Sequence, residues 1–207
     1  MKFSTSKTEL QQALQKLSKA APTRSTLPIL GCVLLEASTE KTTLRATDLE
    51  ITIQVEISVS LERAGSAALP IKTLLDITTE LPETRLTLTV DEKNRAGIQT
   101  DSGIYDLMGK PADEFPATPD NQDTASIQIS AELLKGVIDA TSFAVSRDEL
   151  KPALTGVLFR FGSNGLTAVS TDGHRLVKYT STDFEQENYV GDMIIPRKFL
   201  TFMSAQL

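Results

Sequence analysis

The chain repeats itself, and this internal repeat is the sequence feature that most limits its fold. When the sequence is compared with itself at an offset of 124 residues, 11 of the 53 ungapped pairs from Met1 to Ile53 are identical, against about three expected by chance. The identical pairs include Pro28 and Pro152, Leu30 and Leu154, Val33 and Val157, Leu34 and Leu158, Thr47 and Thr171, and Asp48 and Asp172. After a slip of two residues, residues 69–74 align with residues 195–200. Two copies of one domain explain this pattern better than a chance likeness between β-strands.

A segment with the composition of a linker separates the two copies. Residues 111–125 contain three prolines and four acidic residues, and Phe115 is their one large apolar side chain. We therefore predict two domains, over residues 1–122 and 126–207. The first copy continues well past Leu74, whereas the second ends at Leu207 within a helical pattern. We expect the second domain to be incomplete in this sequence.

The apolar pattern predicts an α+β fold in each copy. Ser6 to Glu9 fits a capping box, and the helical spacing that follows predicts a helix over residues 7–20, with a counterpart after Ser130. Residues 51–61 alternate between apolar and polar, which is typical of one half-buried strand. Pro70 and Pro196 each begin a second helical pattern. Antiparallel sheet packed against two helices per copy is the architecture that this order favours.

Composition excludes some classes of protein and leaves others open. The net charge of −6 argues against tight binding of nucleic acid through a basic surface. Cys32 is the single cysteine and cannot form an internal disulfide. The N-terminus lacks the apolar segment of a secretory signal, and no apolar run could span a membrane. We expect a cytoplasmic protein.

The most distinctive motif is Thr171 to Leu176, with the sequence TDGHRL. Asp and Gly favour a tight turn, which would place His174 and Arg175 at a surface edge beside an apolar leucine. Such a turn could dock a short peptide, or it could be an ordinary strand-end turn with solvated side chains. His174 is the only histidine, and no second ligand stands at metal-site spacing. Because nucleotide-binding and hydrolase motifs are also missing, we expect no catalytic activity, no metal and no cofactor.

This motif resembles the signature of the bacterial β sliding clamps, the processivity subunits of replicative DNA polymerases. The N-terminal residues 1–3, the stretches 26–30 and 47–50, and residues 195–198 are also similar to that family. The resemblance implies a clamp fold in which two chains, each of three similar domains, close a ring with sheets outside and two inner helices per domain. It implies that this chain holds domain one and part of domain two, and that the third domain is absent.

The family resemblance also implies two sets of site residues. Partner peptides from polymerase and clamp-loader subunits would bind at Leu154, Thr171, Gly173, His174, Arg175 and Leu176. Sequence-independent contacts with double-stranded DNA would come from Arg24, Lys72, Arg147, Lys151, Arg197 and Lys198. Leu154 could equally be plain core, and each cation could be an ordinary solvated side chain. The chain has Pro152 and Ala153 where the family commonly carries aromatics, so stacking on DNA bases is not expected there.

The function that the resemblance implies is that of a sliding clamp, which works as a homodimeric ring. The alternative is a peptide-binding scaffold of clamp-like fold that does not encircle DNA. A lack of positive charge on the helices that would face the hole would favour the scaffold. Such charge is present but sparse: Lys135 in the second copy, for example, stands between Glu132 and Asp139.

Overall fold

The computed structural model describes residues 1–22, 25–117, 126–148, 150–162, 165–182, 184 and 189–207. The chain divides into two compact units, Met1–Pro119 and Asp120–Leu207. Each unit has its own apolar core. The two units, called unit one and unit two below, are therefore described separately.

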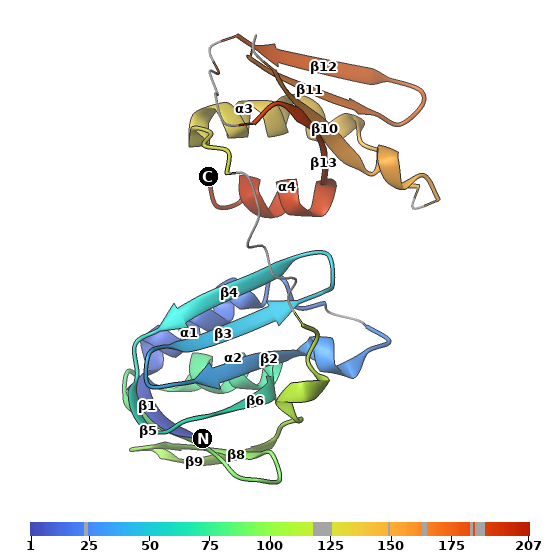
Figure 1. Ribbon diagram of the computed structural model, residues 1–207. Helices are drawn as coiled ribbons and strands as arrows, with labels where there is room; N and C mark the ends of the chain where they lie inside the picture. The colour runs from blue at the N-terminus through green and yellow to red at the C-terminus, as the bar shows by residue number, and fades with distance from the viewer. Residues whose placement is uncertain (23–24, 118–125, 149, 163–164, 183, 185–188) are drawn as a thin grey trace. The chain divides into compact units, whose positions relative to one another are not determined.

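Unit one consists of two antiparallel sheets and two α-helices (Figure 1). Its first sheet has the order β5-β1-β7-β8-β9 and its second the order β4-β3-β2-β6. The strands are β1 (Lys2–Ser6), β2 (Cys32–Ala37), β3 (Thr42–Thr47), β4 (Thr52–Ile57), β5 (Ser60–Arg63), β6 (Gly65–Pro70), β7 (Arg85–Val90), β8 (Arg95–Thr100) and β9 (Gly103–Met108). The helices are α1 (Lys7–Leu17) and α2 (Ile71–Glu80), with short 3-10 helices η1 (Pro28–Gly31) and η2 (Ala112–Glu114).

Helix α1 begins as the sequence predicts but uses its capping residues differently. The Ser6 hydroxyl accepts a hydrogen bond from the Glu9 amide at 3.1 Å, as a capping box requires. The Glu9 carboxylate accepts a bond from the Ser58 amide, at 3.0 Å, and so ties the helix to a distant strand connection. The helix ends at Leu17, three residues before the predicted end, and Ser18 forms its C-cap.

The prediction of one strand over residues 51–61 is wrong, because the chain changes sheets in the middle of it. Strand β4 ends at Ile57 in one sheet, and β5 begins at Ser60 in the other. Both backbone groups of Ser58, in the break, are held: the Thr5 hydroxyl donates to its carbonyl at 2.9 Å, and its amide binds Glu9. The alternation of apolar residues continues across the break, so periodicity alone does not reveal it.

One core joins both sheets and both helices of unit one. Helices α1 and α2 pack side by side, and α1 also contacts β3 and β4. The largest fully buried side chains include Leu10 and Leu14 from α1, Leu35 and Leu44 from the second sheet, and Leu86 and Leu88 from the first. Leucines on one face of the helix and alternate residues of the strands thus share one core. This core determines which face of each sheet is buried.

A second, smaller cluster corrects the predicted linker. Phe115 is only 7% exposed and packs with Ile29, Leu30, Cys32 and Leu34. The Arg45 guanidinium carbon lies 5.9 Å from the centre of the Phe115 ring. Lys110 pairs with Ala68 of β6 through two backbone hydrogen bonds. The stretch up to Phe115 therefore belongs to unit one and covers the sheet face opposite the helices.

Unit two repeats the second sheet and both helices of unit one. Its sheet has the order β12-β11-β10-β13, which matches β4-β3-β2-β6 strand for strand. The elements are α3 (Ala131–Thr141), β10 (Gly156–Gly162), β11 (Gly165–Thr171), β12 (Leu176–Ser181), β13 (Gly191–Pro196) and α4 (Arg197–Ser204), with 3-10 helices η3 (Ser142–Ala144) and η4 (Pro152–Leu154). The prediction of an α+β fold with repeated antiparallel sheets and two helices each is confirmed.

The start of unit two departs from the repeat. In unit one, β1 is paired on both sides, by β5 and by β7. The corresponding residues 126–130 are not in a strand. The described part of unit two contains no strand that matches β5 or β7.

Candidate functional site

The motif Thr171 to Leu176 forms the turn between β11 and β12, and its backbone is held by two side chains. The Thr171 hydroxyl donates to the Arg175 carbonyl at 2.7 Å and accepts from the Gly173 amide at 3.1 Å. The Asp172 carboxylate accepts from the amides of His174 and Arg175, both at 3.0 Å. The side chains of Thr171 and Asp172 thus hold the backbone of the turn.

Unit one contains the same set of hydrogen bonds at the corresponding turn. The Thr47 hydroxyl donates to the Ile51 carbonyl at 3.0 Å and accepts from the Leu49 amide at 3.1 Å. Asp48 accepts from the Glu50 and Ile51 amides at 3.0 and 2.8 Å. The third turn residue has a positive φ in both copies, 78° at Leu49 and 90° at Gly173. We call this shared arrangement the Thr-Asp frame.

The two copies of the frame present different side chains. Unit two shows Gly173, His174, Arg175 and Leu176 where unit one shows Leu49, Glu50, Ile51 and Thr52. Leu176 is 66% exposed. His174 and Arg175 are also exposed. An exposed leucine beside two polar side chains on a rigid turn is suited to docking a short peptide.

The turn thus brings together five of the six residues predicted to bind peptide. The sixth, Leu154, ends the 3-10 helix η4 and is half-buried. Its carbonyl accepts from the Ser146 amide at 2.9 Å. Among the described residues, no hydrogen bond joins it to the turn.

Asp172 was not among the predicted site residues, although it holds the turn. Backbone hydrogen bonds from Arg175 and His174, together with the Arg175 side chain, lower the pKa of its carboxyl from 3.8 to about 2. The Arg175 Nε lies 2.9 Å from its Oδ2. The identity of Asp48 and Asp172 in the repeat was the signal that could have identified it.

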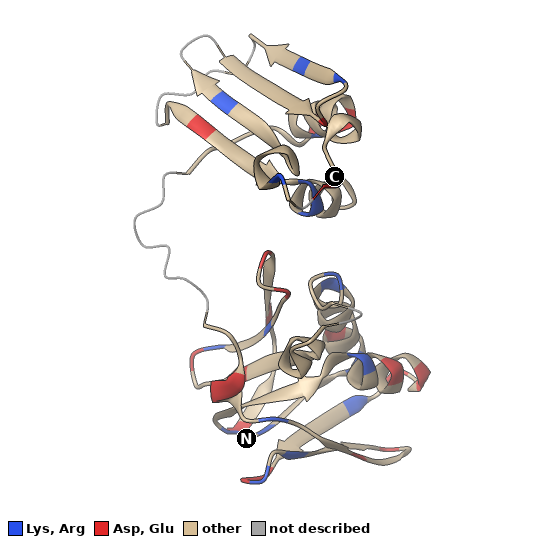
Figure 2. Cartoon of the chain, turned by 90° about the vertical axis from the view of Figure 1, so that its right-hand side faces the viewer, with Lys and Arg blue, Asp and Glu red and all other residues tan. Residues whose placement is uncertain are grey.

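The residues predicted to contact DNA lie at several places. Lys72 and Lys198 are equivalent in the repeat, and each is the second residue of its helix, α2 or α4. Lys151 precedes η4, and its Nζ lies 3.9 Å from a carboxylate oxygen of Asp148. Arg24 lies outside the described residues. Figure 2 shows lysine and arginine interspersed with acidic residues in both units.

Two of the predicted DNA-contacting residues share a pocket with one predicted to bind peptide. A hollow of about 430 Å³ in unit two is lined by Phe143, Ser146, Arg147, Asp172, Arg175 and Arg197, together with Val145. The Arg175 guanidinium carbon lies 5.5 Å from the centre of the Phe143 ring. Phe143 is the middle residue of η3, and no sequence pattern predicted that it would line a pocket.

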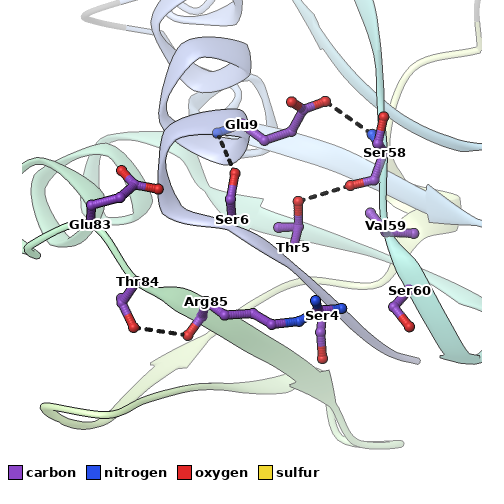
Figure 3. A pocket seen from close by; sticks show the side chains of 10 residues that line it. All are labelled: Ser4, Thr5, Ser6, Glu9, Ser58, Val59, Ser60, Glu83, Thr84 and Arg85. Carbon is purple, nitrogen blue, oxygen red and sulfur yellow. Dashed lines mark hydrogen bonds between the residues drawn. The ribbon is translucent and has the colours of Figure 1, made fainter.

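A hollow of about 670 Å³ in unit one is rich in hydroxyl groups (Figure 3). Several of these groups already serve the fold: Ser6 caps α1, Thr5 binds the Ser58 carbonyl, and Ser4 bonds to Thr87 at 2.8 Å. Thr8 is hydrogen-bonded to Glu83. The hollow thus lies where β1, α1 and the β4–β5 connection are fastened together.

Among the described residues, no group of three or more histidine, cysteine, aspartate or glutamate side chains could hold a metal ion. None of the helices found in the described ranges is long and apolar enough to cross a membrane.

Comparison with known proteins identifies a family for each unit. The family model described as DNA polymerase III beta subunit, N-terminal domain, matches residues 1–119. The model for the central domain of the same subunit matches residues 128–207. The Beta sliding clamp of Synechococcus elongatus is 39% identical over 178 residues, which cover 85% of this chain and 48% of that protein. The Beta sliding clamp of Bacillus subtilis is 32% identical over 99% of this chain and 56% of its own length.

Solved structures show the same fold. The DNA polymerase III beta chain from Streptococcus pneumoniae superposes with a TM-score of 0.92 at 28% identity, covering 100% of this chain and 56% of that one. The DNA polymerase sliding clamp from Bacillus subtilis gives 0.89 at 32% identity, covering 100% and 57%. This chain spans about half the length of the curated relatives that it matches. With its two units matched in order by the N-terminal and central domain models, the chain belongs to the DNA polymerase III beta subunit family.

Proposed function

We propose that the chain forms part of a DNA sliding clamp, a ring that encircles duplex DNA and keeps the replicative polymerase on it. The observation that carries this proposal is the succession of two matched domains, each with a pair of helices beside an antiparallel sheet. In the ring, two copies of a three-domain protein place the helices toward the DNA. A closed ring stays on the duplex without strong electrostatic attraction, so a net charge of −6 is compatible with this function.

The partners in this proposal are short peptide segments of polymerase and clamp-loader subunits. They dock at the turn of unit two, where Leu176 offers an apolar contact and His174 a polar one. The clamp acts in the cytoplasm. It is a processivity factor and has no catalytic activity of its own. Lys72, Arg147, Arg197 and Lys198 supply contacts to DNA phosphates without reading sequence.

The ring is tested by retention on DNA of different topology. The protein that contains this chain is loaded onto nicked circular DNA, and half of the sample is then linearised with a restriction enzyme. We expect the protein to stay on the circle and to leave the linear DNA, because a ring slides off free ends. Equal retention on both forms would contradict the ring.

Peptide binding at the turn is tested by one substitution and a matched control. Leu176→Ala is expected to weaken the binding of a fluorescent polymerase-derived peptide about tenfold, since truncating an apolar anchor typically costs more than 1 kcal/mol. Leu49→Ala, on the corresponding turn of unit one, is expected to change the affinity by less than about twofold. Fluorescence anisotropy measures both. Equal losses in the two variants would argue against a site at the unit two turn.

The alternative is a peptide-binding scaffold that never surrounds DNA. The mixture of charges in both units favours it, because a surface that neutralises phosphates is usually basic. A scaffold would bind peptide in the anisotropy experiment but would show no preference for circular DNA. The two experiments together therefore separate the two functions.

A further inference from the structure

The proposed peptide site of unit two has two parts, and one short segment contacts both of them. The parts are Leu154 and the turn from Thr171 to Leu176, which no hydrogen bond joins directly among the described residues. The segment runs from Thr141, the last residue of α3, through η3 to Ser146. It is called the η3 segment below. Three contacts connect it to the two parts of the site.

The first contact joins the η3 segment to the strand that leads into the turn. The Ser170 hydroxyl donates to the Thr141 carbonyl at 2.6 Å. Ser170 is 2% exposed and Thr141 is fully buried. Loss of this hydrogen bond would leave a polar group buried without a partner, which is costly in free energy. The bond therefore favours one relative position of the end of α3 and β11.

The other two contacts reach residues of the site itself. The Arg175 guanidinium carbon lies 5.5 Å from the centre of the Phe143 ring, a distance at which the cation and the ring attract each other. The Ser146 amide donates to the Leu154 carbonyl at 2.9 Å. The η3 segment thus bridges the turn and Leu154.

The repeat indicates that the fold does not require these contacts. The residues of unit one that correspond to Ser170, Phe143 and Ser146 are Ala46, Lys19 and Pro22. None of them can make the same contact, because alanine has no hydroxyl, lysine has no ring and proline has no N–H. Ala46 is fully buried, so an apolar residue fills the position of Ser170. The Thr-Asp frame is common to both units, whereas the residues that make the three contacts are present in unit two alone.

We infer that the η3 segment is the positioning element of the peptide site. It holds Leu154 and the turn at one separation, and this separation selects peptides whose two apolar anchor side chains have the matching spacing. Because a pre-organised site loses less conformational entropy on binding, the same contacts also raise the affinity. The inference rests on the proposed function, since it takes Leu154 and the turn as the peptide site.

Two peptides test the selection of spacing. One is the polymerase-derived peptide, and the other is the same peptide with one glycine inserted between its apolar anchors. Fluorescence anisotropy gives the ratio of their affinities for the protein that contains this chain. We expect wild type to prefer the native spacing about tenfold or more, and Ser170→Ala to lower this preference about threefold. A variant that is merely less stable would lose affinity for both peptides alike, so its ratio would not change.

The matched control for Ser170→Ala is Thr141→Ala. It removes a buried hydroxyl that donates within α3, to the Val137 carbonyl at 2.7 Å, but it keeps the backbone carbonyl that Ser170 binds. We expect this variant to be less stable and to keep the wild-type ratio within about twofold. Urea unfolding measures the stability of both variants.

Substitutions of Phe143 test the second contact without disturbing the core, because this side chain is 55% exposed. Phe143→Leu removes the ring and is expected to lower the preference for native spacing about threefold. Phe143→Tyr keeps the ring and is expected to preserve the preference. These two variants decide the question even if Ser170→Ala does not fold.

Each other result counts against the positioning role. It is overturned if wild type binds both peptides equally, if Ser170→Ala and Phe143→Leu keep the wild-type ratio, or if Thr141→Ala lowers the ratio as much as Ser170→Ala does. Failure of wild type to bind the native peptide, or equal losses in Leu176→Ala and Leu49→Ala, would instead remove the proposed peptide site and this inference with it. The circular-DNA experiment tests the ring independently of all these outcomes.

Discussion

Leu49 has a φ of 78°, a value that side chains with a Cβ rarely adopt, and its side chain is 60% exposed. Gly173 takes the same role in unit two, with open space where a Cβ would lie. We expect Leu49→Gly to stabilise unit one by about 0.5 kcal/mol, since relief of about 1 kcal/mol of strain exceeds the entropy cost of glycine. Gly173→Ala should destabilise unit two by about 1 kcal/mol. Urea unfolding of each variant measures both changes, and effects of the same sign would refute the argument.

Asp172 gives unit two a pH dependence of a defined sign. Its pKa in the folded chain is about 2, below the ordinary value of 3.8, so the carboxylate stabilises the folded state. That contribution is complete above the unfolded pKa and is lost as the pH falls through the folded one. In Asp172→Asn the amide oxygen can still accept both backbone bonds, but it does not titrate.

We therefore expect the stability difference between wild type and Asp172→Asn to shrink as the pH falls from about 4.5 to about 2.5. Urea unfolding at a series of pH values provides the measurement. A difference that stays constant over this range would show that the carboxylate titrates alike in both states.

Among the elements, the stretch that ends at Phe115 acts as a cover over part of the sheet of unit one. Cys32 lies beneath it in the same cluster, and burial raises the pKa of the Cys32 thiol above its usual value. Phe115→Ala should cost about 3 kcal/mol and speed the reaction of Cys32 with a thiol reagent at least tenfold. Ellman's reagent gives the rate, and urea unfolding the stability.

The control for this prediction is Phe143→Ala. Phe143 is 55% exposed, in contrast to Phe115, so its loss should cost less than about 1 kcal/mol. The Cys32 rate should not change, since Phe143 belongs to the other unit. An unchanged Cys32 rate in Phe115→Ala would mean that the segment is not what protects the thiol.

For helices and strands, the sequence predicted those that occur in both copies of the repeat. It did not predict features that depend on contacts between residues far apart in the sequence. Both second helices begin directly after the predicted prolines, Pro70 and Pro196. The break at Ser58 depends on Thr5 and Glu9, which lie 53 and 49 residues away in the sequence. Burial of Phe115 likewise depends on partners in η1 and β2, which a composition argument does not see. The convergence of Arg147, Arg175 and Arg197 requires knowledge of side-chain directions, so it was not predicted either.

For the whole molecule, two separate cores predict two separate unfolding events. Leu35 and Phe159 are equivalent in the repeat and almost fully buried, each in its own core. Leu35→Ala should lower the stability of unit one, and Phe159→Ala that of unit two, each by about 3 kcal/mol. Native-state hydrogen exchange with mass spectrometry assigns the loss to a unit. Faster exchange throughout the chain in either variant would indicate that the two units unfold together.

The Thr-Asp frame also bears on how a doubled domain can diversify. Every hydrogen bond of the frame joins a threonine or aspartate side chain to the backbone, so the turn backbone is held without hydrogen bonds from the other four side chains. Unit two accordingly has Gly173, His174, Arg175 and Leu176 on the same backbone frame that carries Leu49, Glu50, Ile51 and Thr52 in unit one. The two copies therefore differ in four side chains of the turn, whereas the hydrogen-bonded backbone that carries these side chains is the same in both.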